Sequence, residues 1–184
     1  MTCIIAHVKN GVGYMAGDYL ASNSHMKVDR KDDKVFEKHD MLFGFTSSYR
    51  MGQILKYCFE PPKNEPKLTD HGYMVKLFIP ELIKVYNDNS YGMKTTKGDA
   101  VGGTFLVIRN GKIFCIEGDF QVGEYKDNIW TCGSGYEVAY GAMKAFEYSD
   151  FSPEEKLRKS ITITSEIIGS VGKRCKIIKK DFQK

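Results

Sequence analysis

Two Asn-Gly dipeptides, Asn10-Gly11 and Asn110-Gly111, each separate two apolar, β-rich runs of the chain. Asn-Gly favours the two-residue turn whose backbone twist matches that of paired strands. The runs on either side of each turn are therefore predicted to pair as antiparallel strands. These runs are residues 2–9 with 12–17, and residues 103–108 with 112–117. Both halves of the chain are thus predicted to form antiparallel sheet. Residues 41–45 and 129–132 are predicted to add further strands.

Helical patterns follow each strand-rich part of the chain. Apolar residues spaced i, i+3, i+4 and i+7 after Ser47 or Ser48 predict a first helix that stops at Pro61. A second helix is predicted after Thr69 or Asp70. Pro80 lies inside its pattern, so we expect a kink or a restart there.

The second half of the chain repeats this order. One helix is predicted to begin at residues 133–135, and another after the Ser152 cap, followed by a strand over residues 174–180. Strands, two helices, strands, two helices and a strand indicate an α+β protein instead of alternating βαβ units. Two antiparallel sheets flanked by helix pairs would bury every apolar face. The sequence therefore predicts a four-layer αββα sandwich, formed by residues 1–184 as a single domain.

Composition limits the class of protein. The chain has 184 residues, 42% of them apolar and 12% aromatic, which suits a buried core and is unlike a disordered chain. Its 27 basic and 23 acidic residues give a net charge of +4 with both signs mixed, so we expect no nucleic-acid partner. No apolar run approaches the ~18 residues that span a bilayer, and no secretory signal is evident. We expect a cytoplasmic protein without a membrane partner.

The cysteines argue against a metal site. They are scattered, odd in number, and form no CxxC pair: Cys3, Cys58, Cys115, Cys132 and Cys175. None has a histidine at metal-ligand spacing. We therefore expect reduced thiols, no metal and no cofactor, and we exclude a small disulfide scaffold.

Thr2 directly follows the initiator methionine. A small side chain there permits an aminopeptidase to remove Met1, which would leave Thr2 with a free α-amino group. Such a group has a pKa of about 7.7–8.0, so it can serve as a general base near neutral pH. It would then activate the Thr2 hydroxyl as a nucleophile. Small second residues are common, so the same feature also fits a terminus without a chemical role.

Three further features gain meaning beside Thr2. Counting back through the Asn10-Gly11 turn places Gly17-Asp18 opposite Thr2. Lys34 begins an apolar strand, and an inward-pointing lysine would lower the proton affinity of the Thr2 hydroxyl and amine. Gly133-Ser134-Gly135, between a strand and a helix, could present a hydroxyl and backbone N–H groups to a reacting centre. Taken singly, they are an ordinary turn, a solvated lysine and a permissive loop.

Taken together, these features carry a family resemblance. The chain resembles the proteasome β-subunit and HslV-like branch of the N-terminal-nucleophile (Ntn) hydrolases in four motifs: Thr2, Gly17-Asp18, Lys34 and Gly133-Ser134-Gly135. The similarity is densest over residues 2–36 and continues through residues 43–45 and 103–117. It implies the same αββα sandwich that the order of elements predicts.

The resemblance implies a role for each matching residue. Thr2 would be the nucleophile once Met1 is removed, and Asp18 and Lys34 would be the charged pair that supports it. Ser134 would join the hydrogen-bond network around the Thr2 amine. A backbone N–H of Ser47 or Ser48 would bind the oxyanion. Three glycines would support this arrangement: Gly17, Gly133 and Gly135.

The chain departs from the family pattern at several points, among them Tyr136-Glu137 after the Gly133-Ser134-Gly135 motif. Cys3 stands where close relatives have a second threonine, and we expect it to be a buried substitution. The acidic residue that the family carries near residues 167–172 is either Glu166 or absent. The family's substrate pocket corresponds to the surroundings of Asn23, Lys34 and Phe45.

The activity that the resemblance implies is that of a threonine-type endopeptidase acting on polypeptides. It further implies a homo-oligomeric ring and, as in some relatives, an AAA+ unfoldase as partner. Two alternatives remain open. One is a catalytically inactive scaffold or assembly protein of the same fold, and the other is an amidase of this fold that acts on a small molecule.

Overall fold

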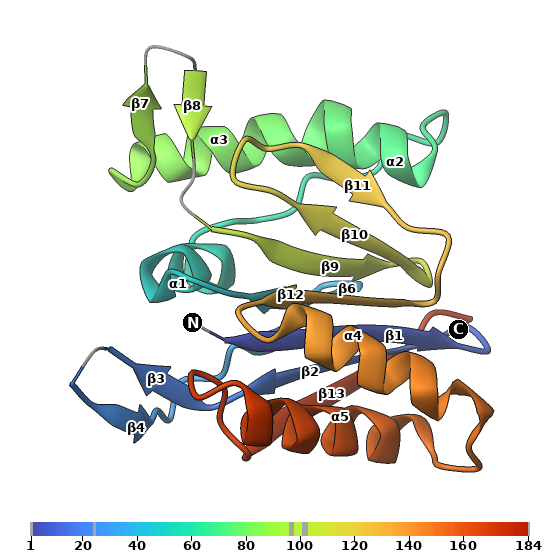
Figure 1. The fold of residues 1–184 in the computed structure, drawn as a ribbon. Coiled ribbons are helices and arrows are strands. Elements are labelled where there is room, and N and C mark those ends of the chain that lie inside the picture. The colour runs from blue at the N-terminus through green and yellow to red at the C-terminus, as the bar shows by residue number, and fades with distance from the viewer. Residues whose placement is uncertain (1, 24, 96–97, 101–102, 184) are drawn as a thin grey trace.

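Two stacked β-sheets lie between two layers of helices in the computed structural model, which describes residues 2–23, 25–95, 98–100 and 103–183 (Figure 1). The four-stranded sheet has the order β12 (Ile129–Gly133), β1 (Cys3–Lys9), β2 (Val12–Asp18) and β13 (Cys175–Asp181). The five-stranded sheet has the order β11 (Val122–Glu124), β10 (Lys112–Ile116), β9 (Phe105–Arg109), β6 (Met41–Phe45) and β5 (Val35–Lys38). Neighbouring strands in both sheets are antiparallel.

Helices cover the outer face of each sheet. The five-stranded sheet is covered by α1 (Tyr49–Tyr57), α2 (Asp70–Tyr73), a π-helical segment (Met74–Phe78) and α3 (Ile79–Asp88). The four-stranded sheet is covered by α4 (Tyr136–Ala145), a 3₁₀ turn (Phe146–Tyr148) and α5 (Pro153–Ile167). The predicted αββα sandwich is therefore confirmed.

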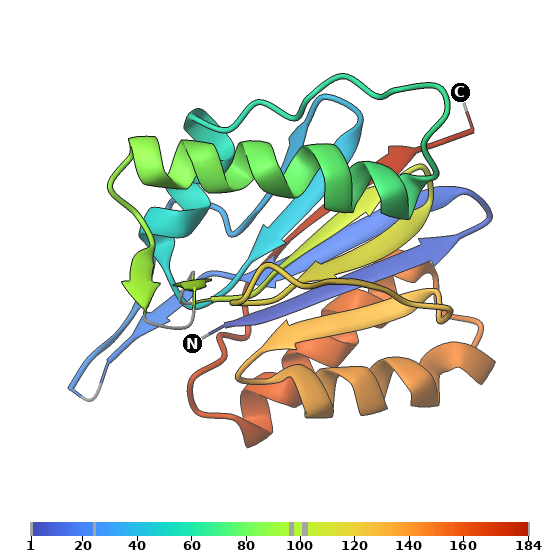
Figure 2. The ribbon, with the colours of Figure 1, turned by 90° about the horizontal axis from the view of Figure 1, so that it is seen from above.

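Two short hairpins extend the sandwich at one end. They are β3 (Leu20–Ser22) with β4 (Lys27–Asp29), and β7 (Met93–Thr95) with β8 (Gly98–Ala100). Figures 1 and 2 place both hairpins at the end where the chain begins, while the C-terminus lies at the opposite end. The chain therefore begins at the same end of the sandwich as the two hairpins.

Three apolar layers hold the sandwich together. Phe43 and Phe78 belong to the layer between the five-stranded sheet and its helices. Ile4 and Leu106 belong to the layer between the sheets, and Ile5 lies in the layer beneath α4 and α5. Successive side chains of a strand point to opposite faces. β1 therefore contributes to the layer between the sheets and to the layer beneath α4 and α5, and it is buried on both faces.

Local sequence signals explain how these elements begin and end. Both residues of the Asn10-Gly11 turn have positive φ, 50° and 72°, as this turn type requires, and Asn110-Gly111 has 49° and 71°. Ser48 caps α1 by accepting from Met51 N, and Ser152 forms a capping box with Glu155 at the start of α5. A π-helical segment runs directly into α3 just before Pro80, and Phe78 and Ile79 keep helical backbone angles. The helix therefore continues through this point by a π-bulge, and the expected restart does not occur.

Two further expectations need correction. The register of β1 and β2 pairs Gly17 with Ile4, so Asp18 falls beside Cys3 and not opposite Thr2. A two-residue turn pairs Lys9 directly with Val12, which fixes this register, and the prediction was wrong by one position. In addition, β4 lies in a polar stretch for which we predicted no strand, because its partner β3 supplies the backbone hydrogen bonds.

No helix in the described part of the chain is both long enough and apolar enough to cross a membrane.

Gly44 tests how closely the two sheets pack. A Cβ atom there would lie 2.5 Å from Ile4 Cγ2 and 2.7 Å from Met15 Sδ, so we expect Gly44→Ala to lower the free energy of unfolding by about 1–3 kcal/mol. Gly141→Ala is the matched control. Gly141 lies in α4 with nothing within 4 Å of its added Cβ, so alanine should stabilise by about 0.5–1 kcal/mol. Urea unfolding followed by circular dichroism measures both, and a neutral Gly44→Ala would contradict the tight packing.

Candidate active site

Asp18 and Lys34 form a buried ion pair at the end of the sandwich where the chain begins. Lys34 Nζ lies 3.0 Å from Asp18 Oδ1, and the two residues are only 2% and 1% exposed. Lys34 Nζ also donates to the carbonyl oxygen of Leu20, at 2.6 Å. The predicted charged pair is therefore present, and its lysine points inward.

The Asp18 carboxylate accepts three backbone N–H groups in addition to the Lys34 ammonium. Cys3 N donates to Oδ1 at 3.0 Å, while Leu20 N and Gly172 N donate to Oδ2 at 3.1 and 3.0 Å. A buried carboxylate needs such donors to compensate for lost hydration. Through them Asp18 joins β1 and β3 to the loop that precedes β13.

Burial changes the proton affinity of two neighbours of Asp18. It lowers the pKa of the Lys34 ammonium, and the Asp18 carboxylate opposes this shift. Burial raises the pKa of the Cys3 thiol, and the Asp18 charge raises it further. Cys3 therefore stays protonated at neutral pH and is a poor nucleophile, as expected of a buried substitution.

Thr2 is buried and lies beside Ser134, which follows β12. Thr2 N donates to Ser134 Oγ at 3.3 Å, and Ser134 Oγ lies 3.4 Å from the Thr2 carbonyl oxygen. Ser134 Oγ also shares a hydrogen bond of 2.9 Å with Ser170 Oγ, in which either hydroxyl can donate. Ser134 thus links the Thr2 backbone nitrogen to Ser170. Met1 lies outside the described residues.

Glycines permit this close approach. Gly133 has a φ of +97°, and a Cβ atom there would overlap the Thr2 carbonyl oxygen. A Cβ at Gly135 would lie 2.5 Å from Thr164 Cγ2, and one at Gly17 would lie 2.8 Å from Ile4 Cδ1. All three predicted glycines therefore occupy positions without room for a side chain.

The two candidate oxyanion donors differ in their hydrogen bonding. Ser48 N donates to the Thr46 carbonyl oxygen at 2.7 Å and so is already engaged. Ser47 has a φ of +65°, and no described residue accepts a hydrogen bond from its backbone N–H. A left-handed backbone at a non-glycine residue is uncommon, and such strained positions recur at binding and catalytic sites as well as in ordinary turns. Of the two, Ser47 has the backbone N–H available to a ligand.

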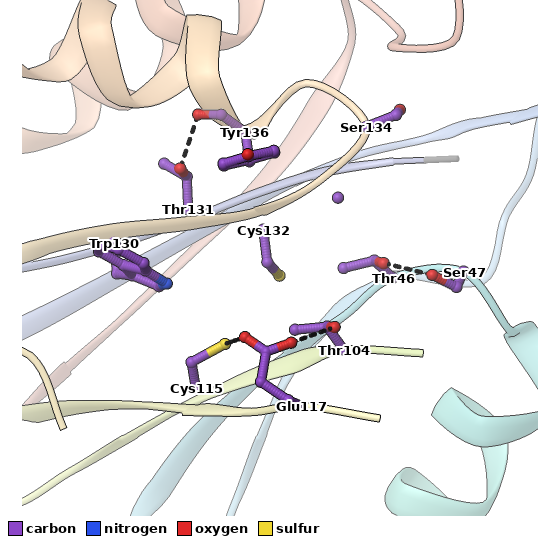
Figure 3. A pocket seen from close by; sticks show the side chains of 11 residues that line it. Thr46, Ser47, Thr104, Cys115, Glu117, Trp130, Thr131, Cys132, Ser134 and Tyr136 are labelled. Atoms are coloured by element: carbon purple, nitrogen blue, oxygen red, sulfur yellow. Dashed lines mark hydrogen bonds between the residues drawn. The ribbon is translucent and has the colours of Figure 1, made fainter. Parts of the chain in front are cut away.

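Three cavities meet at Ser47. A crevice of about 10 Å³, here called the Thr2 crevice, is lined by Thr2, Lys34, Phe45, Ser47 and Tyr49. A pocket of about 240 Å³, the hairpin pocket, lies along the β3–β4 hairpin and includes Asn23, Ser47 and Tyr49. A pocket of about 670 Å³, the Glu117 pocket, includes Ser47, Glu117 and Ser134 (Figure 3). The three residues expected around the substrate pocket therefore lie in two cavities: Asn23 lines the hairpin pocket, whereas Lys34 and Phe45 line the Thr2 crevice.

Glu166 is not part of this cluster. It is exposed near the end of α5, and no hydrogen bond within the described residues joins it to Thr2, Ser134 or Ser170. Sequence reasoning did not identify Ser170 and Gly172, which do contact the cluster. The signal for both was the Gly/Ser-rich composition of residues 169–172, which is typical of a loop held close to another backbone.

The described residues include no group of three or more His, Cys, Asp or Glu side chains arranged to hold a metal ion.

Solved structures share this architecture. Thiobacillus denitrificans BPH matches with a TM-score of 0.81 and 19% sequence identity over 98% of each chain. BPH in complex with epoxomicin gives the same TM-score and identity over 98% of this chain and 99% of that one. Eukaryotic HslV from Trypanosoma brucei matches with a TM-score of 0.68 and 16% identity, over 97% of this chain and 98% of the HslV chain. This chain has the proteasome/HslV-like fold. Neither a known protein family nor a curated protein sequence matches it.

Within this HslV-like fold, the Asp18–Lys34 pair should dominate local stability. Asp18→Asn leaves the buried ammonium without a counter-charge and replaces an accepting oxygen by a donor. We expect the free energy of unfolding to fall by about 3–5 kcal/mol in guanidinium denaturation.

Asp32→Asn is the matched control for this measurement. Asp32 pairs with Arg30 at 2.6 Å, but both side chains are 38% exposed, so its loss should lower stability by no more than about 1 kcal/mol. Equal losses in the two variants would contradict the special role of the buried pair.

Proposed function

We propose that this protein is an N-terminal threonine endopeptidase that cleaves polypeptides with Thr2 after removal of Met1. The observation that carries the proposal is the shared position of Thr2 and Lys34 in one crevice, with Thr2 N bonded to Ser134. A nucleophile, a cation and a hydroxyl that orients the amine are the groups that such a reaction needs. The HslV-like fold supports the proposal.

The reaction would begin at the Thr2 hydroxyl. Its oxygen attacks the carbonyl carbon of the scissile peptide bond, and its proton passes to the Thr2 α-amine, directly or through one water. Ser134 Oγ accepts a hydrogen bond from the Thr2 backbone nitrogen in the structure, and after removal of Met1 it would orient the free amine in the same way. Nucleophile and general base thus belong to one residue.

The carbonyl oxygen of the substrate becomes an oxyanion in this step. The Ser47 N–H, beside the Thr2 crevice, is the donor that we assign to it. Collapse of the tetrahedral intermediate breaks the C–N bond, and the protonated amine of Thr2 gives its proton to the leaving nitrogen. Water then hydrolyses the Thr2 ester and restores the free hydroxyl.

Lys34 would set the proton affinities of this step. A nearby cation favours the neutral form of an amine and the ionised form of a hydroxyl. The first effect keeps the Thr2 amine unprotonated and so available as a base at neutral pH, and the second favours release of the proton by the Thr2 hydroxyl. Asp18 holds the ammonium in place through its 3.0 Å contact and is a positioning residue.

The proposal extends to partners and location. The two pockets that include Ser47 would hold stretches of the polypeptide. BPH, which has a similar fold, forms a complex with epoxomicin. By its likeness to HslV, we further propose a cytoplasmic homo-oligomeric ring, served by an AAA+ unfoldase.

The first test is the intact mass of the protein expressed with its own terminus, together with digestion of an unfolded protein such as casein. We expect the mass to lack one methionine, because only then does the Thr2 amine become a base. Thr2→Ala should lower cleavage by at least about 10³-fold, since the nucleophile is lost, and epoxomicin should inhibit the wild type.

Thr2→Ser is the matched control, because it keeps both hydroxyl and amine and should retain measurable cleavage. Full retention of Met1, with no cleavage of casein, would overturn the proposal in favour of a scaffold protein. Loss of Met1 with hydrolysis of small amides but not of casein would favour the amidase.

Ser134→Ala tests the orienting hydroxyl. Loss of the hydrogen bond to Thr2 N should lower kcat by about 10–100-fold with little change in KM, and should shift the acidic limb of the pH–rate profile. Ser165→Ala is the control, because its hydroxyl donates to the Thr162 carbonyl within α5 and bonds no other described residue. A Ser134→Ala enzyme with wild-type kcat and pH profile would exclude this role.

A further inference from the structure

We infer that the Glu117 pocket binds a lysine or arginine side chain of the polypeptide, next to the bond that is cut. This inference rests on the proposed function and names one part of its substrate specificity.

The position of the pocket ties it to the reacting residue. Ser134, bonded to Thr2 N, lies at its edge, and so does Ser47, which also lines the Thr2 crevice. The hairpin pocket meets Ser47 as well. An extended chain bound at the Thr2 crevice would therefore have two cavities beside it, both of which include Ser47.

Glu117 supplies the only ionisable carboxylate among the residues that line this pocket. Its Oε2 accepts from Thr104 Oγ1 at 2.9 Å and its Oε1 accepts from Cys115 Sγ at 3.2 Å, as Figure 3 shows. Burial raises the pKa of the Cys115 thiol, so this group remains a donor. These two neutral donors hold the carboxylate in place without neutralising it.

Within the described residues, no lysine, arginine or histidine forms an ion pair with Glu117. A half-buried carboxylate without a counter-ion attracts a cation more strongly than a solvated one does. Each Glu117 oxygen retains further accepting capacity, because a carboxylate oxygen offers two lone pairs. The carboxylate can therefore accept further hydrogen bonds from a cationic group.

The walls suit the stem of a long basic side chain. Trp130 lines the pocket and is held by stacking on Tyr125, with ring centroids 3.5 Å apart, and Tyr136 lines it as well. Aromatic faces pack against methylene groups and also attract a cation. In Figure 3, Glu117 and Cys115 lie on one side of the pocket, and Thr131 and Tyr136 lie on the other. A lysine or arginine side chain can contact the aromatic rings with its stem and Glu117 with its head.

The hairpin pocket has the opposite character. Its charged residue is Arg30, whose guanidinium lies 3.8 Å from the Tyr49 ring centroid and is already paired with Asp32. A basic substrate side chain gains no counter-charge there. The charge of the two cavities therefore orients a polypeptide that carries one basic residue near the cleaved bond.

The experiment measures binding in a protein that cannot cut. In a Thr2→Ala background, the affinity of labelled decapeptides with one lysine at each position in turn is compared with that of peptides carrying norleucine instead. We expect lysine to bind about tenfold more tightly than norleucine at one position, as a partly buried charge-assisted contact gives. Added Glu117→Gln should bring this ratio close to 1.

Glu124→Gln is the matched control. Glu124 lies on β11, outside the pocket, and its removal changes the net charge by the same amount, so the tenfold ratio should persist. Norleucine binding as tightly as lysine at every position would overturn the inference, and so would a lysine preference that survives Glu117→Gln or a failure of every peptide to bind. If Glu117→Gln does not fold, the ratio of lysine to norleucine affinity in the Thr2→Ala protein with Glu117 intact decides the matter.

Failure of the proposed function has a different signature. It would appear as retained Met1 and no cleavage by the wild type, whereas the binding ratio in Thr2→Ala needs no catalysis. Cleavage of casein without any lysine or arginine preference would leave the peptidase standing and remove only the role of Glu117.

Discussion

One buried carboxylate, that of Asp18, holds together the end of the molecule where the chain begins. It binds groups from four segments: Cys3 N, Leu20 N, Gly172 N and Lys34 Nζ. A charge left unpaired in this interior costs several kcal/mol, so these segments must converge for the chain to fold. Thr2 directly precedes one of the bonded residues. The interaction that stabilises the fold therefore also fixes the place of the candidate nucleophile.

Much of the fold could be predicted because its signals are local. The Asn-Gly turns and the Ser152–Glu155 capping box act within a few residues, so they are visible before any tertiary contact is known. Lys34 and Asp18 could be singled out only together with Thr2, through the motif spacing that resembles the Ntn hydrolases, because each charge alone fits an ordinary turn or a solvated side chain. The hydrogen-bond partners of Asp18 could not be predicted in the same way. Cys3 N donates to the Asp18 carboxylate, and this contact depends on the register of β1 and β2.

The pocket around Glu117 could not be predicted, because its parts come from strands with different partners. Glu117 follows β10, whereas Trp130 lies on β12 in the other sheet. Only the stacking of the two sheets brings them to one cavity, and no periodicity within either strand records that contact. Ser170 was missed for a similar reason, since its role depends on a loop that returns to Ser134 across the end of the sheet.

The position of Glu166 bears on how Thr2 would work as its own base. With Glu166 exposed, the hydroxyls of Ser134 and Ser170 form an uncharged relay to Thr2 N. Lys34 is then the only charged side chain among the residues lining the Thr2 crevice. A carboxylate there would raise the proton affinity of the amine and hold it as ammonium, which cannot accept a proton. A cation keeps more of the amine neutral, so an uncharged relay suits a residue that must supply both nucleophile and base.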